Sequence, residues 1–196
     1  MQTETTLRKA SAEEFRTIFE WMKRQFHEGE LKPLVQLERM RADGRYEVYG
    51  LWRGTELLAY ALLACTADRK LWMLDYYAVL PEHQDAGWGG RFLSQLRRVV
   101  PGDAILLEVE DPDLVEDASE KARCQRRMRF YDRSQCLPTD VWLNLFGFNY
   151  VILALPIASA PENGEIHAAL EEIYHMFFPP EDYAENVRFR PDKRHG

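Results

Sequence analysis

A glycine-rich turn between an apolar segment and a helical pattern is the part of this sequence best suited to bind an anion. The turn covers residues 84–90, with the sequence QDAGWGG, and begins three residues beyond Pro81. Backbone amides at a helix N-terminus are unpaired and carry the positive end of the helix dipole. Glycines let such a backbone approach a phosphate closely. The turn therefore predicts a phosphate site, with a tight turn of purely structural use as the alternative.

Two common nucleotide-binding motifs do not fit this turn. A mononucleotide P-loop ends in Gly-Lys-Ser/Thr, which is missing here. A dinucleotide fingerprint needs a third glycine spaced from the second, within a βαβ unit. The turn instead has the pattern Gln-x-x-Gly-x-Gly, formed by Gln84, Gly87 and Gly89.

The elements that position this turn follow from hydrophobic periodicity and turn residues. Strands are predicted at 5–9, 46–52, 57–65, 71–80, 104–109, 141–145 and 150–155. A first helix is predicted from Ser11 to about Phe26, because Ser11 and Glu14 form a capping-box pattern. Further helices are predicted from Pro33 to near Asp43, from the glycine turn to Pro101, from Ser119 through Tyr131, and from Gly164 to Phe177. The turn thus joins a strand to a helix.

The glycine turn in this setting resembles the cofactor loop of the GNAT superfamily of N-acetyltransferases. In that family the loop amides bind the pyrophosphate of coenzyme A, and the end of the preceding strand pairs with the pantetheine arm. The resemblance covers the chain from the first strand to Leu155 and implies acetyl-CoA (coenzyme A) as the cofactor. The cofactor-binding residues that it implies are Tyr77, Ala78, Val79, Gln84, Asp85, Ala86, Gly87, Trp88, Gly89 and Gly90.

The same resemblance implies a fold. We expect an α+β (α/β) fold with a GNAT-like mixed, mostly antiparallel central sheet flanked by helices, in which the fourth and fifth strands splay to admit the cofactor. A chain of 196 residues fits one domain, so residues 1–196 are predicted to form a single GNAT-like acyltransferase domain. Residues 163–196 would form a C-terminal helix and tail outside the resemblance. That aromatic helix would cover either the domain's own sheet or a partner, which leaves a homodimer open.

Acyl transfer from a thioester to an amine needs a base, a stabilised oxyanion and a proton for the leaving thiolate. Glu108 resembles the glutamate that some family members use as general base, with a raised pKa or a water relay. Tyr131 resembles the tyrosine that protonates the coenzyme A thiolate, and a phenol with a pKa of about 10 suits that task. These two residues are the predicted catalytic pair. The alternatives are a glutamate that faces solvent or a lysine, and a tyrosine that only fills the core.

The helix that carries Tyr131 departs from the family pattern. The stretch from Glu108 to Tyr131 is longer than in the simplest members, and no asparagine lies two turns before Tyr131, where many members have one on the cofactor. Cys124, Gln125 and Arg126 stand there instead. An arginine among Arg123, Arg126 and Arg127 could reach a cofactor phosphate, and a solvated helix face is the alternative.

Three carboxylates are the predicted substrate-binding residues. Glu28 and Glu30 lie between the first two helices, in a loop that usually borders the acceptor site in this superfamily, and would bind a cationic amine. Asp75 alternates with Tyr77 along the strand that enters the glycine turn, so we expect it to point into the cleft, where it is an alternative base. Solvated loop carboxylates and a lysine- or arginine-paired aspartate are the alternatives.

Composition narrows the class of protein. With 25 basic and 32 acidic residues the net charge is -7, which disfavours nucleic acid as a partner. No apolar stretch is long enough for a membrane span, and the N-terminus does not resemble an export signal. The three cysteines form no disulfide framework, which favours a cytoplasmic protein. The scattered histidines form no metal or nucleophile cluster, so no metal is predicted.

The sequence therefore predicts an N-acyltransferase that moves an acetyl (acyl) group directly from acetyl-CoA to a primary amine. The acceptor would be a small molecule or a peptide. A catalytically inactive GNAT-like module that binds or senses acyl-CoA is one alternative, which the unusual helix around Cys124 keeps open. A nucleotide-binding α/β protein is the other.

Overall fold

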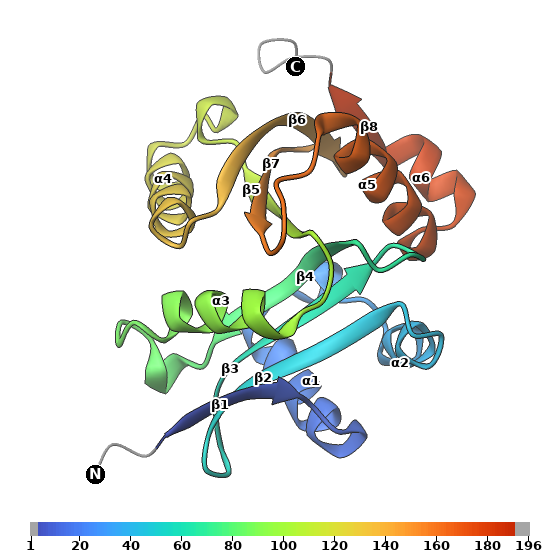
Figure 1. Cartoon of the computed structure of the whole chain (residues 1–196). Coiled ribbons are helices and arrows are strands. Elements are labelled where there is room, and N and C mark those ends of the chain that lie inside the picture. The colour runs from blue at the N-terminus through green and yellow to red at the C-terminus, as the bar shows by residue number, and fades with distance from the viewer. Residues whose placement is uncertain (1–3, 191–196) are drawn as a thin grey trace.

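In the described part of the chain, the apolar strands form one eight-stranded sheet with helices on both of its faces (Figure 1). The computed structural model describes residues 4–190. The strands pair in the order β1-β2-β3-β4-β5-β7-β6-β8. They are β1 (Thr5–Lys9), β2 (Tyr46–Arg53), β3 (Glu56–Cys65), β4 (Leu71–Val79), β5 (Ala104–Glu110), β6 (Leu137–Leu145), β7 (Phe148–Pro156) and β8 (Val187–Arg190). Only β4 and β5 are parallel neighbours, so the predicted mixed, mostly antiparallel sheet is confirmed.

The helices begin and end at the signals that the sequence carries. They are α1 (Ala12–Gln25), α2 (Leu34–Ala42), α3 (Trp88–Val99), α4 (Ala118–Arg133), α5 (Asn163–Phe177) and α6 (Pro180–Asn186), with short 3-10 turns η1 (Glu28–Glu30), η2 (Pro81–His83) and η3 (Pro112–Leu114). The predicted capping box of α1 is present, because the backbone N–H of Glu14 donates to Ser11 Oγ at 3.1 Å and that of Ser11 donates to Glu14 Oε2 at 2.8 Å.

Each face of the sheet has its own hydrophobic core. On the first, which we call the α5 face, buried residues of α1, α2 and α5 pack against the strands, among them Phe15, Leu37 and Ile173. On the second, the α3 face, Phe92 and Leu96 of α3 are fully buried and α4 packs alongside. In Figure 1, α3 and α4 lie at the left of the sheet, and α2, α5 and α6 lie at the right.

The sheet opens between β4 and β5. These strands pair only from Leu71 to Met73, which face Ala104 to Leu106. Beyond that point β4 continues to Val79 along β3 and β5 continues to Glu110 along β7, but the two no longer pair with each other. The predicted splay of the fourth and fifth strands is confirmed, and we call the unpaired stretch between them the opening.

The structure extends the predictions for the last third of the chain. Strand β6 begins at Leu137, earlier than the predicted 141, because Pro138 and a break in register before Trp142 hide its start. Helix α6 and strand β8 were not predicted, and β8 pairs with β6 at the edge of the sheet. Helix α5 covers its own sheet, with Leu170 and Tyr174 fully buried. Residues 191–196 of the predicted tail, His195 included, lie outside the described residues.

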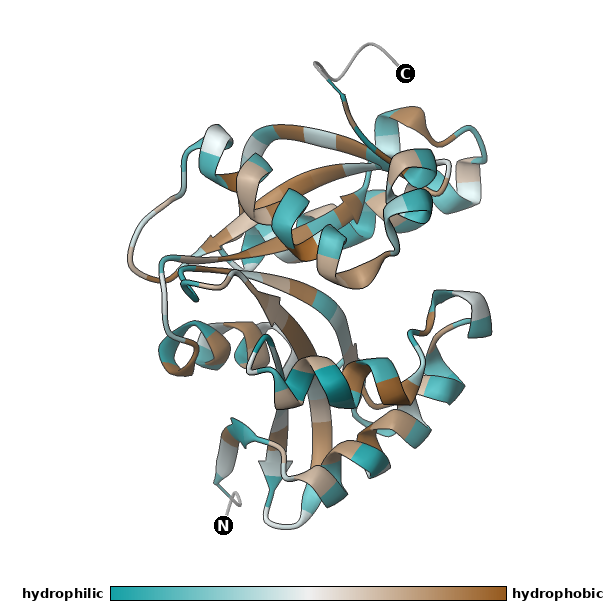
Figure 2. Cartoon of the chain, turned by 90° about the vertical axis from the view of Figure 1, so that its right-hand side faces the viewer, coloured by the Kyte–Doolittle hydropathy of each residue, from teal (hydrophilic) through white to brown (hydrophobic). Residues whose placement is uncertain are grey.

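Hydropathy follows this layered arrangement (Figure 2). The strands are mostly brown, as expected for segments buried on both faces, whereas the helices alternate brown and teal segments. Within residues 4–190, no helix combines the length and the apolar composition that a membrane span requires.

Candidate active site

The glycine turn leads into the N-terminus of α3 without any side chain that caps it. Gly87 stands at the N-cap in the left-handed conformation, with φ of 77°, and makes no side-chain cap hydrogen bond. Asp85 also has a positive φ, and residues 85–87 are exposed. Gln84 instead folds back, and its Nε2 donates to the carbonyl of Val79 at 3.3 Å. The first amides of α3 are therefore available to an anion.

Gly89 lets α4 approach this turn closely. A Cβ at Gly89 would lie 3.1 Å from the ring of Phe130 in α4 and 3.1 Å from the Tyr77 hydroxyl. That hydroxyl donates to the Gly89 carbonyl at 2.8 Å, and the Tyr77 ring packs against Phe92 with centroids 5.3 Å apart. The side chain of Tyr77 thus supports the turn from the α3 face. Trp88, by contrast, lies under the guanidinium of Arg91, 4.9 Å from its ring centroid.

The end of β4 presents backbone groups at the opening. Ala78 and Val79 lie beyond the paired part of β4 and β5, so no neighbouring strand covers their β5 side. The Val79 carbonyl also accepts a hydrogen bond at 3.0 Å from Nε2 of Gln25, the last residue of α1. A strand edge that stops pairing in this way can take an extended ligand.

Tyr131 lies on the α3 face, close to Tyr77. Its ring packs against Phe130, with centroids 5.1 Å apart. Burial is the main cause that raises the pKa of Tyr131 to about 12. The charge of Arg127 acts to lower this pKa, and Cys136 acts to raise it. Within the described part of the chain the Tyr131 hydroxyl makes no hydrogen bond. This phenol therefore remains protonated at neutral pH and is free to donate.

Glu108 lies on the opposite face. It stands two residues beyond Leu106, which belongs to the core of the α5 face, and it pairs along the sheet with Ile152 of the same core. Its Oε1 is excluded from solvent and finds no hydrogen-bond partner among residues 4–190. Burial raises the pKa of Glu108 to about 8, with a further increase from the charge of Asp75 and a decrease from that of Lys32.

Asp75 does not share a face with Tyr77, contrary to the strict alternation that the sequence suggested. A β-bulge in β4 is the reason, because Leu62 pairs with Tyr76 and Leu63 with Leu74, which leaves Asp75 without a partner in β3. The carboxylate turns to the α5 face, where it accepts a hydrogen bond from the Tyr46 hydroxyl and pairs with Lys32.

Lys32 is a member of the site that the sequence analysis missed. Its Nζ lies 2.8 and 3.0 Å from the two carboxylate oxygens of Asp75. The two residues are 43 positions apart in the sequence, and no motif links them. Only the packing of the loop between α1 and α2 against β4 brings them together.

Glu28 and Glu30 are both exposed, in the 3-10 turn of the same loop. The Tyr76 hydroxyl holds this loop on the sheet, because it accepts from the backbone N–H of Lys32 at 3.0 Å and donates to the Glu30 carbonyl at 2.7 Å. Burial raises the pKa of Tyr150 in β7 to about 12. The negative charges of Glu108, Glu110 and Glu30 raise it further, in that order of size. Glu30 therefore lies near the β5 carboxylates, whereas Glu28 makes no side-chain hydrogen bond or ion pair within residues 4–190.

The arginine-rich start of α4 is largely paired or exposed. Arg123 donates to Glu120 at 2.8 Å and lies 3.7 Å from Glu110. The thiol of Cys124, buried, donates to Glu110 Oε2 at 3.3 Å. Arg126 and Arg127 are exposed. Among residues 4–190, no group of histidines, cysteines and carboxylates could hold a metal ion.

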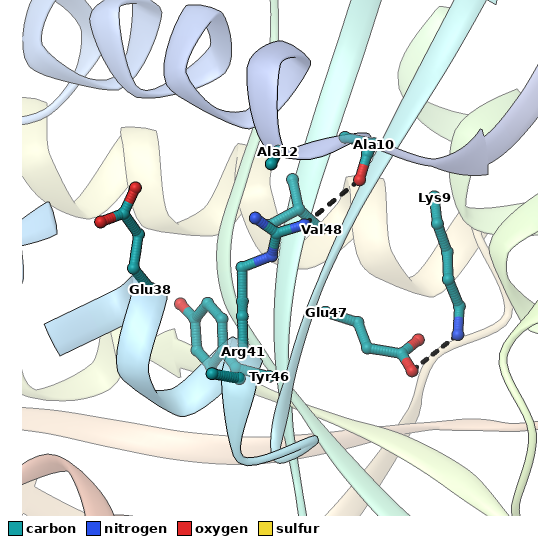
Figure 3. A pocket seen from close by; sticks show the side chains of 9 residues that line it. Lys9, Ala10, Ala12, Glu38, Arg41, Tyr46, Glu47 and Val48 are labelled. Carbon is teal, nitrogen blue, oxygen red and sulfur yellow. Dashed lines mark hydrogen bonds and ion pairs between the residues drawn. The ribbon is translucent and has the colours of Figure 1, made fainter. Parts of the chain in front are cut away.

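A second hollow, of about 440 Å³, lies between β1, β2, α1 and α2 (Figure 3). Its charged groups already have partners, because Lys9 pairs with Glu47 at 2.7 Å and Arg41 donates to the Ala10 carbonyl at 3.2 Å. Tyr46 borders this hollow and also donates to Asp75. The hollow therefore offers no unpaired group for chemistry and lies behind the Asp75 site.

The arrangement joins an anion site to a proton donor on one face and a titratable carboxyl on the other. The glycine turn and Tyr131 lie on the α3 face, and Glu108 lies on the α5 face. Glu108 lies on β5 beyond its paired part, at the opening between β4 and β5. A ligand that is anchored at the turn and enters this opening would lie between a group that gives a proton and a group that takes one.

Comparisons with known proteins agree on the fold. No family model and no curated protein matches the sequence. The structure is similar to the ribosomal-protein-S18-alanine N-acetyltransferase from Escherichia coli, with 21% identity, a TM-score of 0.54, and 82% of this chain and 98% of the other covered. It is also similar to a protein from Bacteroides thetaiotaomicron described as an acetyltransferase of the GNAT family, with 15% identity, a TM-score of 0.65, and coverage of 83% and 92%. An aminoglycoside 6'-N-acetyltransferase complexed with coenzyme A gives 14% identity, a TM-score of 0.56, and coverage of 80% and 99%.

Proposed function

This chain has the fold of the GNAT acetyltransferases, and on that premise we propose that it is an N-acyltransferase. It would transfer an acetyl (acyl) group from acetyl-CoA directly to a primary amine. The observation that carries this proposal is the placement of Glu108 and Tyr131 on opposite faces of the sheet, at the opening between β4 and β5. Direct transfer between two ligands needs a base on one side of the reacting carbon and an acid on the other.

The residues around the glycine turn fit coenzyme A. The uncapped amides of α3 suit a pyrophosphate, and glycines at 87 and 89 leave the backbone open to it. The unpaired edge of β4 at residues 77–79 suits the pantetheine arm as an added strand. Acetyl-CoA supplies the acetyl group as a thioester. The neighbour that acetylates aminoglycosides is complexed with coenzyme A, which supports this cofactor.

Two residues of the chain would move the protons. Glu108 as carboxylate takes a proton from the acceptor ammonium, so that the amine nitrogen has a free electron pair. Tyr131 gives its hydroxyl proton to the thiolate that leaves, and its raised pKa keeps that proton available at neutral pH. The pKa of Glu108, raised to about 8, places its proton exchange near the working pH.

The acceptor would be a cationic primary amine of a small molecule or peptide. It would approach from the α5 face, past the exposed Glu28 and Glu30 and toward Asp75 and Glu108. The net charge of -7 favours such an acceptor over nucleic acid. The three cysteines are free and buried, in keeping with a cytoplasmic enzyme. A homodimer remains compatible with this proposal.

Cofactor binding is the first test. Coenzyme A at one hundred times its dissociation constant should add about 2.7 kcal/mol to stability, which a thermal melt detects as a rise in Tm. ATP and NAD serve as controls at the same concentration. A rise with ATP or NAD, and not with coenzyme A, would point to a nucleotide-binding protein and reject the proposal.

Acetyl transfer is the second test. Release of free thiol from acetyl-CoA is followed with a panel of polyamines, amino acids, aminoglycosides and N-terminal peptides. We expect Tyr131→Phe to slow release about 100-fold with coenzyme A binding intact. Tyr183→Phe, in α6 and away from the opening, is the matched control. No release with any amine, despite coenzyme A binding, would indicate the inactive binding module.

A further inference from the structure

Lys32 is a buried cation that the proposed proton transfers do not use. Only 14% of its side chain is exposed, and its partner Asp75 is 8% exposed. The rings of Phe177 and Tyr76 flank the ammonium, with centroids 3.9 and 5.1 Å from Nζ. The side chain of a loop lysine ordinarily extends into water. Contacts of this ammonium with two aromatic rings and a carboxylate therefore suggest a specific role.

The Lys32–Asp75 pair lies beside Glu108. Met73 of β4 faces Leu106 of β5, so a step of two residues along each parallel strand brings Asp75 level with Glu108 across the opening. Both carboxylates turn to the α5 face. Because Glu108 Oε1 has no hydrogen-bond partner among the described residues, burial sets its raised pKa and the charges next to it adjust that pKa.

Two opposite charges act on Glu108 from different parts of the fold. The negative charge of Asp75 stabilises the protonated carboxyl, and the positive charge of Lys32 stabilises the carboxylate. Asp75 belongs to the sheet, whereas Lys32 belongs to the loop between α1 and α2. The Tyr76 hydroxyl ties that loop down at Lys32 and Glu30. The contacts of this loop with the sheet therefore hold the Lys32 charge near Glu108.

We infer that Lys32 is a positioning residue for the proposed acyl transfer: when its loop is closed on the sheet, the ammonium lets Glu108 give up its proton. When the loop leaves, Glu108 faces Asp75 alone and keeps the proton. The inference deepens the proposed function and rests on it, because it links closure of the loop that carries Glu28 and Glu30 to activation of the base. An amine would be deprotonated only after the loop has closed over it.

Other titratable groups lie near the Glu108–Asp75 pair. Tyr150 of β7 feels the charges of Glu108, Glu110 of β5, Glu30 of the loop and Arg127 of α4. Tyr46 of β2 and Tyr76 of β4 feel the charge of Asp75. Tyr46, Tyr76 and Tyr150 are neutral over the working pH range, since burial raises the pKa of each. Lys32 is the cation that lowers the pKa of Glu108.

The test is a direct titration of Glu108 in the free, full-length protein. Carbon-13 NMR of glutamate-labelled protein follows the side-chain carboxyl, and Glu108→Gln identifies the resonance by its loss. We expect a wild-type midpoint near pH 8. Lys32→Met should raise that midpoint by about one unit, and Asp75→Asn should lower it by about one unit. Lys32→Arg keeps the charge and should leave the midpoint near that of the wild type.

Midpoint shifts of opposite sign in Lys32→Met and Asp75→Asn would support the inference. A loss of packing alone would not shift the Glu108 midpoint in opposite directions for the two partners of one ion pair. The double variant Lys32→Met/Asp75→Asn should return the midpoint toward the wild-type value, and amide spectra of all variants check the fold. Midpoints that move in the same direction, or do not move, would overturn the inference. The titration needs neither acetyl-CoA nor acceptor, so a failure of the proposed function appears separately, as absent thiol release.

Kinetics then connect the pair to the reaction. For an amine that the wild type acetylates, Lys32→Met should lower kcat/KM about tenfold at pH 7, and most of that loss should disappear at pH 9. A loss that persists unchanged at pH 9 would contradict control of the base, since a damaged acceptor site has no reason to recover with pH.

Discussion

At the scale of single residues, the proposed chemistry depends on one carboxyl that the fold buries, Glu108. Glu108 is the only titratable residue of β5 that turns into the core of the α5 face between apolar neighbours, since Glu110 has Cys124 and Arg123 beside it. Desolvation raises the pKa of Glu108 by more than its charged neighbours change it. A carboxyl in such a place can act as a base near neutral pH.

Activity should rise with pH through the titration of Glu108. A base works only when it is deprotonated. Below pH 8, each decrease of one pH unit should therefore lower kcat/KM about tenfold, and above about pH 8 kcat/KM should reach a plateau. The measurement is a pH profile of thiol release with two acceptor amines of different pKa. A midpoint that follows the amine instead of staying near 8 would assign the titration to the substrate and not to Glu108.

The free energy of unfolding should fall with pH over the range in which activity rises. The folded pKa of Glu108, about 8, lies above the unfolded value of 4.5, so the native state binds more protons between these pH values. Stability from this group is therefore lost as pH rises toward 8. Glu108→Gln should melt at a higher temperature than the wild type at pH 9 and nearly together with it at pH 4.5. An equal difference at both pH values would contradict the raised pKa.

The sequence could predict some of these residues and not others. Glu108 and Tyr131 follow a family resemblance on their own strand and helix, so local sequence was enough to propose them. The face of Asp75 depends on a β-bulge, and strict alternation along β4 could not reveal it. Lys32 reaches Asp75 only through the packing of a loop on the sheet, which no spacing in the sequence encodes.

At the scale of elements, the strand, glycine turn and helix of the proposed cofactor site share one close contact between α3 and α4. Gly89→Ala would place a Cβ 3.1 Å from the Phe130 ring and from the Tyr77 hydroxyl, so these side chains must shift by a few tenths of an ångström. We expect a loss of about 1–3 kcal/mol in unfolding free energy and weaker coenzyme A binding. Urea unfolding and calorimetry measure the two effects.

Gly90→Ala is the matched control for that variant. A Cβ there would meet nothing nearer than the Ser134 hydroxyl at 3.9 Å, and alanine favours a helix by about 1 kcal/mol over glycine. Gly90→Ala should therefore be as stable as the wild type or more so. Equal behaviour of the two alanine variants would show that the approach of α4 to the turn does not limit the site.

Most elements could be predicted because their signals are local. The capping box at Ser11, the glycine turn and the apolar runs of β2 to β5 each carry a periodicity or a cap within one segment. Strand β8 has four residues, too few for alternation to stand out, and it forms because β6 offers an edge. Long-range pairing of that kind cannot be read from a short segment.

At the scale of the whole molecule, α5 ties together two halves of a sheet that is weakly joined at its centre. The strands β4 and β5 share only three residue pairs, and α5 packs against β3 and β4 on one side of that junction and β6 on the other. Phe177, at its C-terminal end, is 5% exposed and contacts the rings of Tyr46 and Tyr174. Its carbonyl accepts from Gln36 of α2 at 2.8 Å.

Phe177→Ala should therefore weaken both halves together. Truncation of a buried phenylalanine costs about 3–5 kcal/mol, or a fall in Tm of roughly 10 °C for a domain of this size. Phe148 is 59% exposed, so Phe148→Ala should lower the free energy of unfolding by under about 1 kcal/mol and serves as the control. Hydrogen exchange distinguishes the mechanism: peptides of β2 and of β7 should lose protection to the same extent in Phe177→Ala. Loss confined to β6 and β7 would mean that the halves unfold separately, and that the parallel junction, not α5, holds the opening in shape.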